Sequence, residues 1–325
     1  SANEKYVLCN ADEGEPGTFK DRYILEHDPF TLIEGIAIAC YAVGASRAYI
    51  YLRGEYHHLL DQLQRTIDSV AQVAGLDCRI EIREGAGAYV CGEETALMES
   101  LEGKRGEPRF RPPFPPTQGL WDKPTIINNV ETLMNVPQVL ARGAAWFSSL
   151  GTEQSKGTKV FSVSGDVAAP GVYEVVMGTP LRYLVEGLAW GKDIKMVQVG
   201  GASGRVIPEH RMDTPLAFES ALGAGAVIVY NTSRDVLDVA LRTMEFFVEE
   251  SCGKCTPCRE GTVVMSQGLE RIMGGGGAGH DLADLQDLAE VMALASLCGL
   301  GQAAPNCFVD TLQHFREEYE ARLAR

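Results

Sequence analysis

The sequence predicts an α/β protein whose parallel sheet comes first and whose helices dominate the end of the chain. From Lys5 onward, short apolar runs alternate with helical stretches, which is the pattern of parallel strands joined by crossover helices. The middle of the chain is rich in Val and Gly with alternating apolar positions, and its end has the period of amphipathic helices. A length of 325 residues, 45% of them apolar and 22% charged, favours two or three domains that each bury a core.

The first domain is predicted to span residues 1–150. Its strands are expected at residues 6–9, 48–52 and 78–82. Its helices are expected at residues 30–43, 56–74 and 130–142. Because ligands bind beyond the carboxyl ends of parallel strands, the loops at 10–18 and 83–95 are candidate binding loops. The segment from Pro108 to Pro124, called the proline-rich segment below, is too dense in proline for an ordinary connection, and we expect a fixed cover.

Two further domains are predicted after it. Residues 151–232 are expected to form a small β-grasp-like or mixed domain. Residues 233–325 are expected to be helical, with Ser233 as the N-cap of the first helix. The later helices are expected at about 259–272, 282–296 and 306–323. Four helices favour an antiparallel up-and-down bundle, in which the first and third connections lie at the same end.

Charge and composition exclude several classes of function. The formal charge of −15 repels nucleic acids and anionic lipid, and the Lys and Arg residues are scattered, so no nucleic-acid partner is expected. No run reaches the roughly 20 apolar residues of a spanning helix, so no membrane insertion is expected. The first residues lack the features of a secretory signal, which favours a cytoplasmic protein and reduced cysteines.

Four of the nine cysteines form the most specific pattern in the chain. Cys252, Cys255 and Cys258 have the spacing C-x2-C-x2-C, and Cys298 lies in the connection that the bundle brings to the same end. Three thiolates in seven residues resemble the run that wraps an iron-sulfur cube, whereas structural zinc sites use two separated pairs. A [4Fe-4S] cluster is therefore predicted, with zinc or unligated thiols as alternatives. Buried, unligated thiols are expected at Cys9, Cys40 and Cys78. Cys307 is expected to start the last helix, and Cys91 stays ambiguous.

The two candidate loops have the composition of a nucleotide site. Residues 10–17 carry three carboxylates and two glycines, and residues 85–95 are rich in glycine. Glycine-rich turns before a helix can cradle phosphate, and carboxylates accept hydrogen bonds from ribose or ribityl hydroxyls and repel the 2′-phosphate of NADP(H). The alternatives are a solvated turn and a tight bend, with helix capping for Asn128 and Asn129 and a packing anchor for Phe114.

Six segments together resemble the flavin-bearing, NADH-oxidising subunit of respiratory complex I. They are residues 9–22, 85–97, 127–132, 164–173, 252–258 and 296–301. The same module is found in NAD-linked hydrogenases, formate dehydrogenases and electron-bifurcating complexes. The resemblance implies a Rossmann-like flavin domain, then a ubiquitin-like SLBB domain, then a helical bundle carrying the cluster. In that family, a glycine-rich loop before the strand that matches Cys9 binds nicotinamide nucleotide and flavin phosphate, and residues 1–8 do not contain it.

The resemblance implies three sets of site residues. Those expected to meet FMN are Asn10, Asp12, Glu13, Tyr89, Gly92, Glu93, Asn128, Asn129 and Thr132. Those expected to meet NADH are Glu15, Glu94 and the ring of Phe114, with both glutamates as catalytic candidates. Those expected to hold the [4Fe-4S] cluster are Cys252, Cys255, Cys258 and Cys298.

The function implied by the resemblance is hydride transfer between NADH and FMN, followed by single-electron transfer to the cluster. The implied partners are a small thioredoxin-like [2Fe-2S] subunit and a larger iron-sulfur subunit of one complex. A diaphorase subunit of a hydrogenase, formate dehydrogenase or bifurcating complex is the first alternative. A non-catalytic, metal-binding scaffold subunit is the second.

Overall fold

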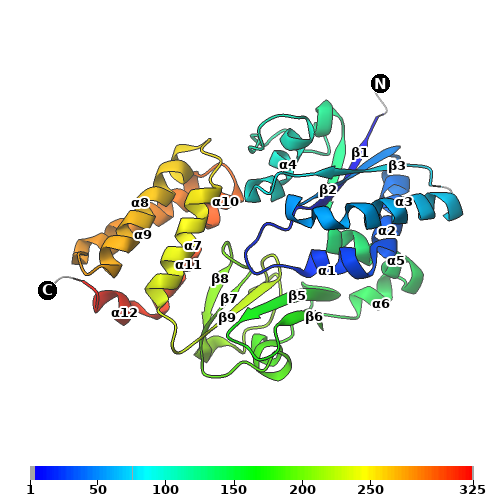
Figure 1. The fold of residues 1–325 in the computed structure, drawn as a ribbon. Coiled ribbons are helices and arrows are strands. Elements are labelled where there is room, and N and C mark those ends of the chain that lie inside the picture. Colours follow the sequence, from blue (N-terminus) through cyan, green and yellow to red (C-terminus); the bar gives the residue numbers. More distant parts are fainter. Residues whose placement is uncertain (1–3, 75, 324–325) are drawn as a thin grey trace. The chain divides into compact units, whose positions relative to one another are not determined.

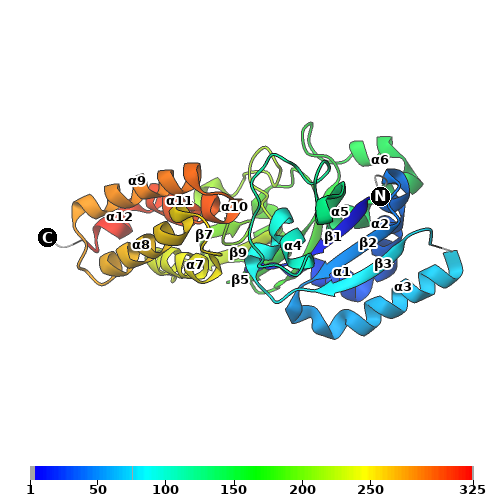
Figure 2. The same cartoon turned by 90° about the horizontal axis from the view of Figure 1, so that it is seen from above.

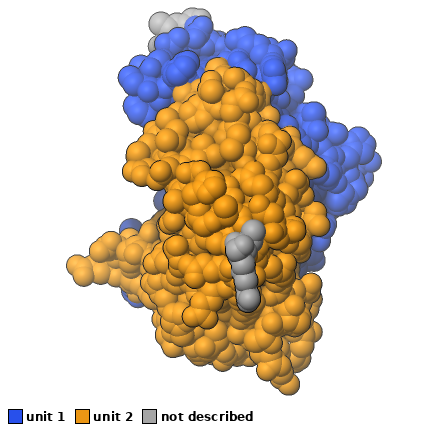
Figure 3. All heavy atoms as spheres, turned by 90° about the vertical axis from the view of Figure 1, so that its left-hand side faces the viewer, with its two compact units in different colours: residues 1–14, 19–150 blue, residues 15–18, 151–325 orange. Residues whose placement is uncertain are grey.

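The computed structural model describes residues 4–74 and 76–323. The chain forms two compact units, residues 1–14 with 19–150 and residues 15–18 with 151–325, which Figure 3 colours separately. The three-domain assignment made from the sequence stays a prediction. Residues 1–3, which entered the expectation of no secretory signal, lie outside the described residues.

The first unit is built on a four-stranded parallel sheet with the order β3-β2-β1-β4. Its strands are β1 (Tyr6–Ala11), β2 (Arg47–Leu52), β3 (Arg79–Glu84) and β4 (Thr125–Asn129). Cys9 of β1 lies between Ile50 of β2 and Asn128 of β4. The parallel α/β sheet is confirmed, whereas β4 was not predicted. Because the chain adds β2 and β3 on one side of β1 and then returns to add β4 on the other, the strand order reverses between β1 and β4.

Helices cover one face of this sheet. The helices of the unit are α1 (Lys20–His27), α2 (Pro29–Val43), α3 (Leu60–Ala74), α4 (Glu94–Leu101), α5 (Val130–Arg142) and α6 (Ala144–Ser148), drawn in Figure 1. Alternate strand residues, such as Val7 and Ile50, are fully buried in a core shared with α1, α2, α3 and α5. Helix α2 begins where Asp28 accepts the N–H of Thr31 and ends at Gly44, which is left-handed at φ 70°. Helix α1 was not predicted.

The other face of the sheet is covered by α4 and the end of the proline-rich segment. The ring of Trp121 lies 5.2 Å from that of Tyr6 and 5.8 Å from that of Tyr49, both edge-on. The Tyr51 hydroxyl lies 2.8 Å from the Ser100 hydroxyl of α4. The proline-rich segment therefore packs on the sheet, as expected of a cover.

The second unit contains a five-stranded mixed sheet with the order β6-β5-β9-β7-β8. Its strands are β5 (Thr158–Gly165), β6 (Gly171–Val176), β7 (Ile194–Val199), β8 (Arg205–Pro208) and β9 (Ala226–Asn231). Only the central pair, β5 and β9, is parallel. Leu184 and Val185 of a short helix, Tyr183–Leu188, pack into the sheet's apolar core. This is the mixed sheet expected from the sequence, and its assignment as an SLBB domain stays a prediction.

The helices of the second unit follow the sheet in the chain. They are α7 (Val236–Glu250), α8 (Thr256–Met273), α9 (Gly279–Ala295), α10 (Gly299–Ala303), α11 (Asn306–His314) and α12 (Arg316–Glu320), seen in Figures 1 and 2. Helix α7 packs on α8 and α11, and α8 packs on α9. Within the described ranges, no helix is both long and apolar enough to span a bilayer.

The helices of the second unit differ from prediction in two boundaries and in α10, which was not predicted. The N-cap of α7 is Asp235, whose carboxylate accepts the N–H groups of Leu237 and Asp238. The predicted cap, Ser233, instead donates its N–H and hydroxyl to Asn231. The single predicted helix at 306–323 is two helices, because the backbone leaves the helical conformation at Phe315, where φ is −132°.

Candidate functional site

The two candidate loops meet at the carboxyl edge of the parallel sheet. Asn10, at the end of β1, donates its side-chain N–H to the carbonyl of Gly92 over 2.8 Å. A Cβ on Gly14 would lie only 3.0 Å from the Tyr89 ring and 3.1 Å from its Cα. A Cβ on Gly92 would lie 3.4 Å from the Asp12 carbonyl. The loops after β1 and β3 therefore form one surface, although β2 lies between their strands.

Strand β4 brings a second pair of polar residues to this edge. Asn129 is the ladder partner of Asn10, and Asn128 precedes it. Open α/β sheets bind ligands in the crevice where the strand order reverses, and in this sheet the reversal lies between β1 and β4. Helix α5 begins directly after Asn129, which caps it by accepting the N–H of Glu131, and Thr132 is exposed in its first turn.

A buried ionic network fixes Asn129. The Lys20 ammonium lies 2.6 Å from Asp21 and 3.1 Å from Glu131, and it donates to Asn129 Oδ1 over 3.1 Å. Asn129 in turn donates its side-chain N–H to Asp21 over 2.7 Å. Burial alone would lower the pKa of Lys20, but Asp21 and Glu131 raise it above its usual range, so the ammonium stays charged.

Glu13 has a structural role in the loop after β1. Its carboxylate accepts the backbone N–H groups of Asp21 and Arg22 at 2.9 and 3.0 Å, and the Tyr56 hydroxyl at 2.9 Å. Burial and the charge of Asp21 raise the pKa of Glu13 to about 7, against the lowering effect of the backbone hydrogen bonds and Lys20. This carboxylate holds the start of α1, so its expected contact with FMN stays a prediction.

Glu93 presents an acceptor that the protein leaves unsatisfied. Its Oε2 accepts the N–H groups of Thr95 and Ala96 and so caps α4. Its Oε1 is buried and, among the described residues, receives no hydrogen bond; an Arg111 guanidinium nitrogen lies 3.6 Å away. A buried carboxylate oxygen needs a donor. The hydroxyl groups of a ribityl chain would supply one, so this edge of the sheet fits a flavin nucleotide.

Glu94 and Phe114 are both solvent-accessible residues of the first unit. The Glu94 carboxylate pairs with Arg111 at 2.6 Å, and each of these side chains is 35% exposed. The Phe114 side chain is 55% exposed, within the proline-rich segment. An exposed ring held between prolines is free to stack on another aromatic ring.

Glu15 belongs to the second compact unit. Its carboxylate accepts the Ser203 N–H at 3.0 Å and the Ser203 hydroxyl at 2.6 Å, and it is buried. A Cβ on Gly201 would lie 2.3 Å from Glu15 Cγ, so only glycine leaves room for this contact. The structure gives Glu15 an anchoring role, and its expected contact with NADH stays a prediction.

The four predicted cluster cysteines gather at the ends of three helices. Cys252 and Cys255 lie between α7 and α8, Cys258 lies in the first turn of α8, and Cys298 directly precedes α10. A Cβ on Gly301 of α10 would lie 2.7 Å from Cys258 Cβ, so α10 packs directly on the first turn of α8. The positive ends of α8 and α10 favour thiolates and a negatively charged ligand.

Donors around these sulfurs suit an iron-sulfur cluster. The Leu297 N–H points to Cys255 Sγ at 3.5 Å, and the Ser251 hydroxyl lies 3.3 Å from Cys258 Sγ. The Ser296 hydroxyl is buried and has no hydrogen-bond partner among the described residues. Burial raises the pKa of Cys258 to about 11, and the neighbouring thiols add to this, so a cationic ligand is needed to hold the thiolate.

Comparison with known proteins places both regions of the chain in one family. Residues 1–138 match the Nuo51 FMN-binding domain, and residues 238–322 match the NADH-ubiquinone oxidoreductase-F iron-sulfur binding region. An F subunit of the NADH-quinone oxidoreductase of Rhizobium meliloti is 45% identical over 98% of this chain and 80% of its own length. The chain belongs to the family of NADH-quinone oxidoreductase F subunits. Its FMN-binding domain and [4Fe-4S] region mark it as an oxidoreductase, which confirms both cofactor predictions.

The family includes hydrogenase subunits. The alpha subunit of the NAD-reducing hydrogenase HoxS of Cupriavidus necator is 42% identical over the whole chain, which spans 56% of that subunit. The crystal structure of an NAD+-reducing [NiFe]-hydrogenase in the H2-reduced state matches with a TM-score of 0.95 and 46% identity. That match covers 99% of this chain and 57% of the solved chain. These relatives are subunits of multi-subunit enzymes.

The structure adds residues that sequence reasoning missed. Lys20, Asp21 and Glu131 fix Asn129, and Arg111 pairs with Glu94. Lys20 and Asp21 lie in the segment 9–22, which resembles the family. A Lys-Asp pair that begins a helix directly after the loop at 10–18 could have indicated this ionic network. Nothing in the sequence indicates which carboxylate pairs with Arg111.

Proposed function

We propose that the full-length protein oxidises NADH at the β1/β4 crevice and delivers the electrons singly, through the cluster, to partner subunits. The observation that supports this most is the buried Glu93 Oε1, which receives no hydrogen bond from the described residues. It lies in the unit whose parallel sheet has a strand order that forms the kind of crevice that binds nucleotides. The same chain also brings four cysteines to the ends of neighbouring helices. When bound, FMN accepts a hydride from NADH and releases single electrons that an iron-sulfur cluster can take.

The residues at the crevice bind and orient the flavin. Glu93 Oε1 accepts a hydroxyl or N–H of the nucleotide, which satisfies the buried oxygen. Asn10 fixes the Gly92 carbonyl, so the glycine-rich loop keeps its shape when ligands enter or leave. The positive N-terminal end of α5, together with Asn128 and Thr132, favours an anionic or oxygen-rich group.

Phe114 and Glu94 bind the nicotinamide nucleotide. The ring of Phe114 provides an aromatic surface for stacking. Glu94 accepts hydrogen bonds from ribose or amide groups, with Arg111 balancing its charge. The cluster of carboxylates at Asp12, Glu93 and Glu94 disfavours the additional 2′-phosphate of NADPH.

A diaphorase role in a hydrogenase is the second candidate. The 42% identity to a hydrogenase alpha subunit and the 46% identity to a solved NAD+-reducing hydrogenase favour it. In either complex, we propose a cytoplasmic location and direct partners that carry iron-sulfur clusters, a small thioredoxin-like [2Fe-2S] subunit and a larger iron-sulfur subunit. Purification of the native complex and identification of its other subunits decides between the two roles.

An anaerobic titration tests the proposed function. Adding NADH to the full-length, flavin-loaded protein is expected to bleach the flavin absorbance, with NADPH bleaching it more slowly. Glu94→Gln is expected to weaken NADH binding or shift the flavin potential, whereas Glu34→Gln, on the exposed face of α2, is expected to change neither. Flavin that stays oxidised in the presence of excess NADH would rule the function out.

A further inference from the structure

The proline-rich segment needs side chains to hold it in place. Six of its residues are prolines without an N–H, so it cannot be fixed by a regular ladder of backbone hydrogen bonds. Its backbone is tied at Pro115, whose carbonyl accepts the Thr125 N–H at 3.0 Å, and at Gly119, whose N–H donates to Lys123 O at 2.8 Å. Both ties lie after Phe114. Before Phe114, Arg111 pairs with Glu94, and the segment has one further side-chain attachment.

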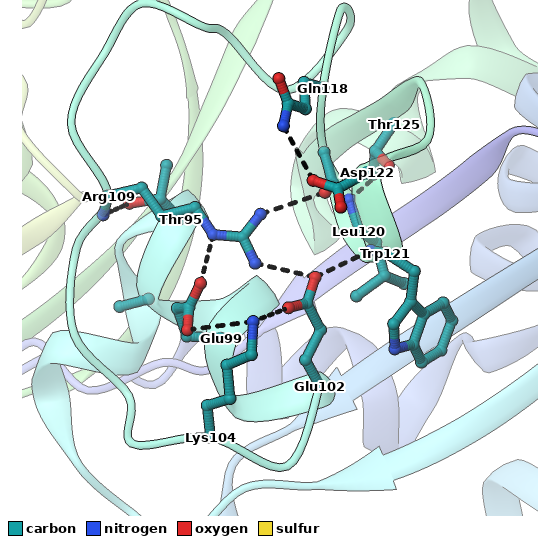
Figure 4. Close-up of polar contacts among 12 residues, drawn as sticks. Thr95, Glu99, Glu102, Lys104, Arg109, Gln118, Leu120, Trp121, Asp122 and Thr125 are labelled. Atoms are coloured by element: carbon teal, nitrogen blue, oxygen red, sulfur yellow. Dashed lines mark hydrogen bonds and ion pairs between the residues drawn. The ribbon is translucent and has the colours of Figure 1, made fainter.

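Arg109 supplies that attachment, as Figure 4 shows. Its Nε donates to Glu99 of α4, its Nη2 lies 2.8 Å from Glu102, and its Nη1 donates to the Gly119 carbonyl at 3.0 Å. One planar guanidinium therefore links α4 to both ends of the loop that carries Phe114. A lysine would not reproduce these three contacts, because its donors share one nitrogen, whereas the guanidinium holds its donors on three nitrogens in a rigid plane.

The charges around Arg109 make this link strong. The Glu102 side chain is only 6% exposed, and it also accepts the Trp121 N–H at 2.7 Å and pairs with Lys104 at 2.7 Å. Burial by itself would raise the pKa of Glu102, but hydrogen bonds from Lys104 and Arg109 hold it below its usual range. Removing the guanidinium leaves two partly buried carboxylates with one lysine, which is destabilising.

Arg109 also reaches the flavin side of the unit through its backbone. Its N–H donates to the Thr95 hydroxyl at 2.8 Å, and that hydroxyl donates to Glu93 Oε2. The side chain that fixes the proline-rich segment thus belongs to the residue whose backbone supports Glu93.

We propose that Arg109 is a positioning residue for the nicotinamide nucleotide: it fixes the proline-rich segment so that Phe114 is held in its binding position. This inference rests on the proposed function. Arg109 itself stays paired with Glu99, Glu102 and Gly119 and touches no reacting atom. Loss of its side chain removes the contacts that join α4 to both ends of the loop between residues 109 and 119, so NADH binding must restrict that loop at a greater entropic cost.

The test uses the full-length, flavin-loaded protein with Arg109→Gln, Arg109→Lys and the control Arg65→Gln, on the exposed face of α3. Arg109→Gln is expected to raise the KM for NADH about ten- to hundredfold while kcat stays within about threefold. Arg109→Lys is expected to recover part of this loss, and the control is expected to keep the wild-type KM. Amide exchange at Thr117 and Gln118, which donate to Phe114 O, is expected to become faster in Arg109→Gln.

A second variant keeps the inference testable if Arg109→Gln does not fold or loses FMN. Glu102→Gln retains the arginine but removes a charged partner, and it is expected to speed the same amide exchange. An Arg109→Gln protein with the wild-type rate of amide exchange and the wild-type KM would overturn the inference. If Arg109→Gln cannot be studied, a wild-type rate of amide exchange in Glu102→Gln would overturn it. If NADH fails to reduce the wild-type flavin, the proposed function fails, while the exchange data still decide whether Arg109 anchors the segment.

Discussion

Replacing Gly301 with alanine adds one methyl group, which is expected to disrupt the cluster site. The added Cβ would lie 2.6 Å from Ser296 Oγ, 2.7 Å from Cys258 Cβ and 2.8 Å from Ser296 Cβ. Real Cβ atoms do not approach other atoms so closely, so α10 must move away from the first turn of α8. Cys298 directly precedes α10 and would move with it.

Gly299, two residues earlier in α10, provides a matched control. A Cβ on Gly299 meets no atom within 4 Å. Glycine to alanine in a helix stabilises by about 0.5–1 kcal/mol, so Gly299→Ala is expected to be neutral or slightly stabilising. Overpacking costs about 1–3 kcal/mol, which corresponds to roughly 5- to 150-fold weaker retention of the cluster in Gly301→Ala.

The assay compares iron and sulfide content, cluster absorbance and the rate of cluster loss to a chelator in the two variants. Gly301→Ala is expected to lose its cluster faster, while its flavin content, bound in the other compact unit, stays at the wild-type level. Equal cluster retention in the two alanine variants would refute the packing of α10 against Cys258.

Two further predictions concern the buried charges beside the flavin crevice. Lys20→Met leaves Asp21 and Glu131 buried without their cation and is expected to cost about 3–5 kcal/mol, seen as a lower midpoint of chemical unfolding than in Arg65→Gln. The pKa of Glu13 is raised from 4.5 to about 7 in the folded protein. Between pH 4.5 and 7, the native state therefore binds a proton at Glu13 that the unfolded state has released. The wild-type protein is therefore expected to lose up to about 3 kcal/mol of stability as pH rises from 4.5 to 7. Glu13→Gln should remove this part of the pH dependence, and identical pH profiles of the unfolding midpoint would contradict it.

The elements with strong periodicity could be predicted from the sequence. The apolar runs of β1 and β2 and the long helices α2, α5, α7, α8 and α9 were expected close to their observed positions. Helix α1 and strand β4 were missed because α1 opens with the charged run Lys20–Arg22 and β4 is five residues long and follows a proline. The order β3-β2-β1-β4, which creates the crevice, depends on where β4 pairs, and no local pattern encodes that.

The candidate site was predictable in its composition but only partly in its contacts. The loops after β1 and β3 were recognised, and the family comparison supports the flavin and the cluster. The partners of individual carboxylates were not recognisable, because they lie far along the chain: Glu15 binds Ser203, and Glu13 binds Tyr56. Such pairs are set by tertiary packing, and a sequence shows only that each carboxylate needs some donor.

The central claim is that electrons from NADH reach a cluster held by Cys252, Cys255, Cys258 and Cys298 in this chain. Low-temperature EPR during an anaerobic NADH titration tests it most directly, with the wild-type protein beside Cys298→Ser. The wild type is expected to develop a reduced-cluster signal as its flavin absorbance falls, whereas Cys298→Ser is expected to bleach its flavin without that signal. A wild-type protein that contains zinc instead of iron, or whose cluster stays oxidised while its flavin is fully reduced, would contradict the claim.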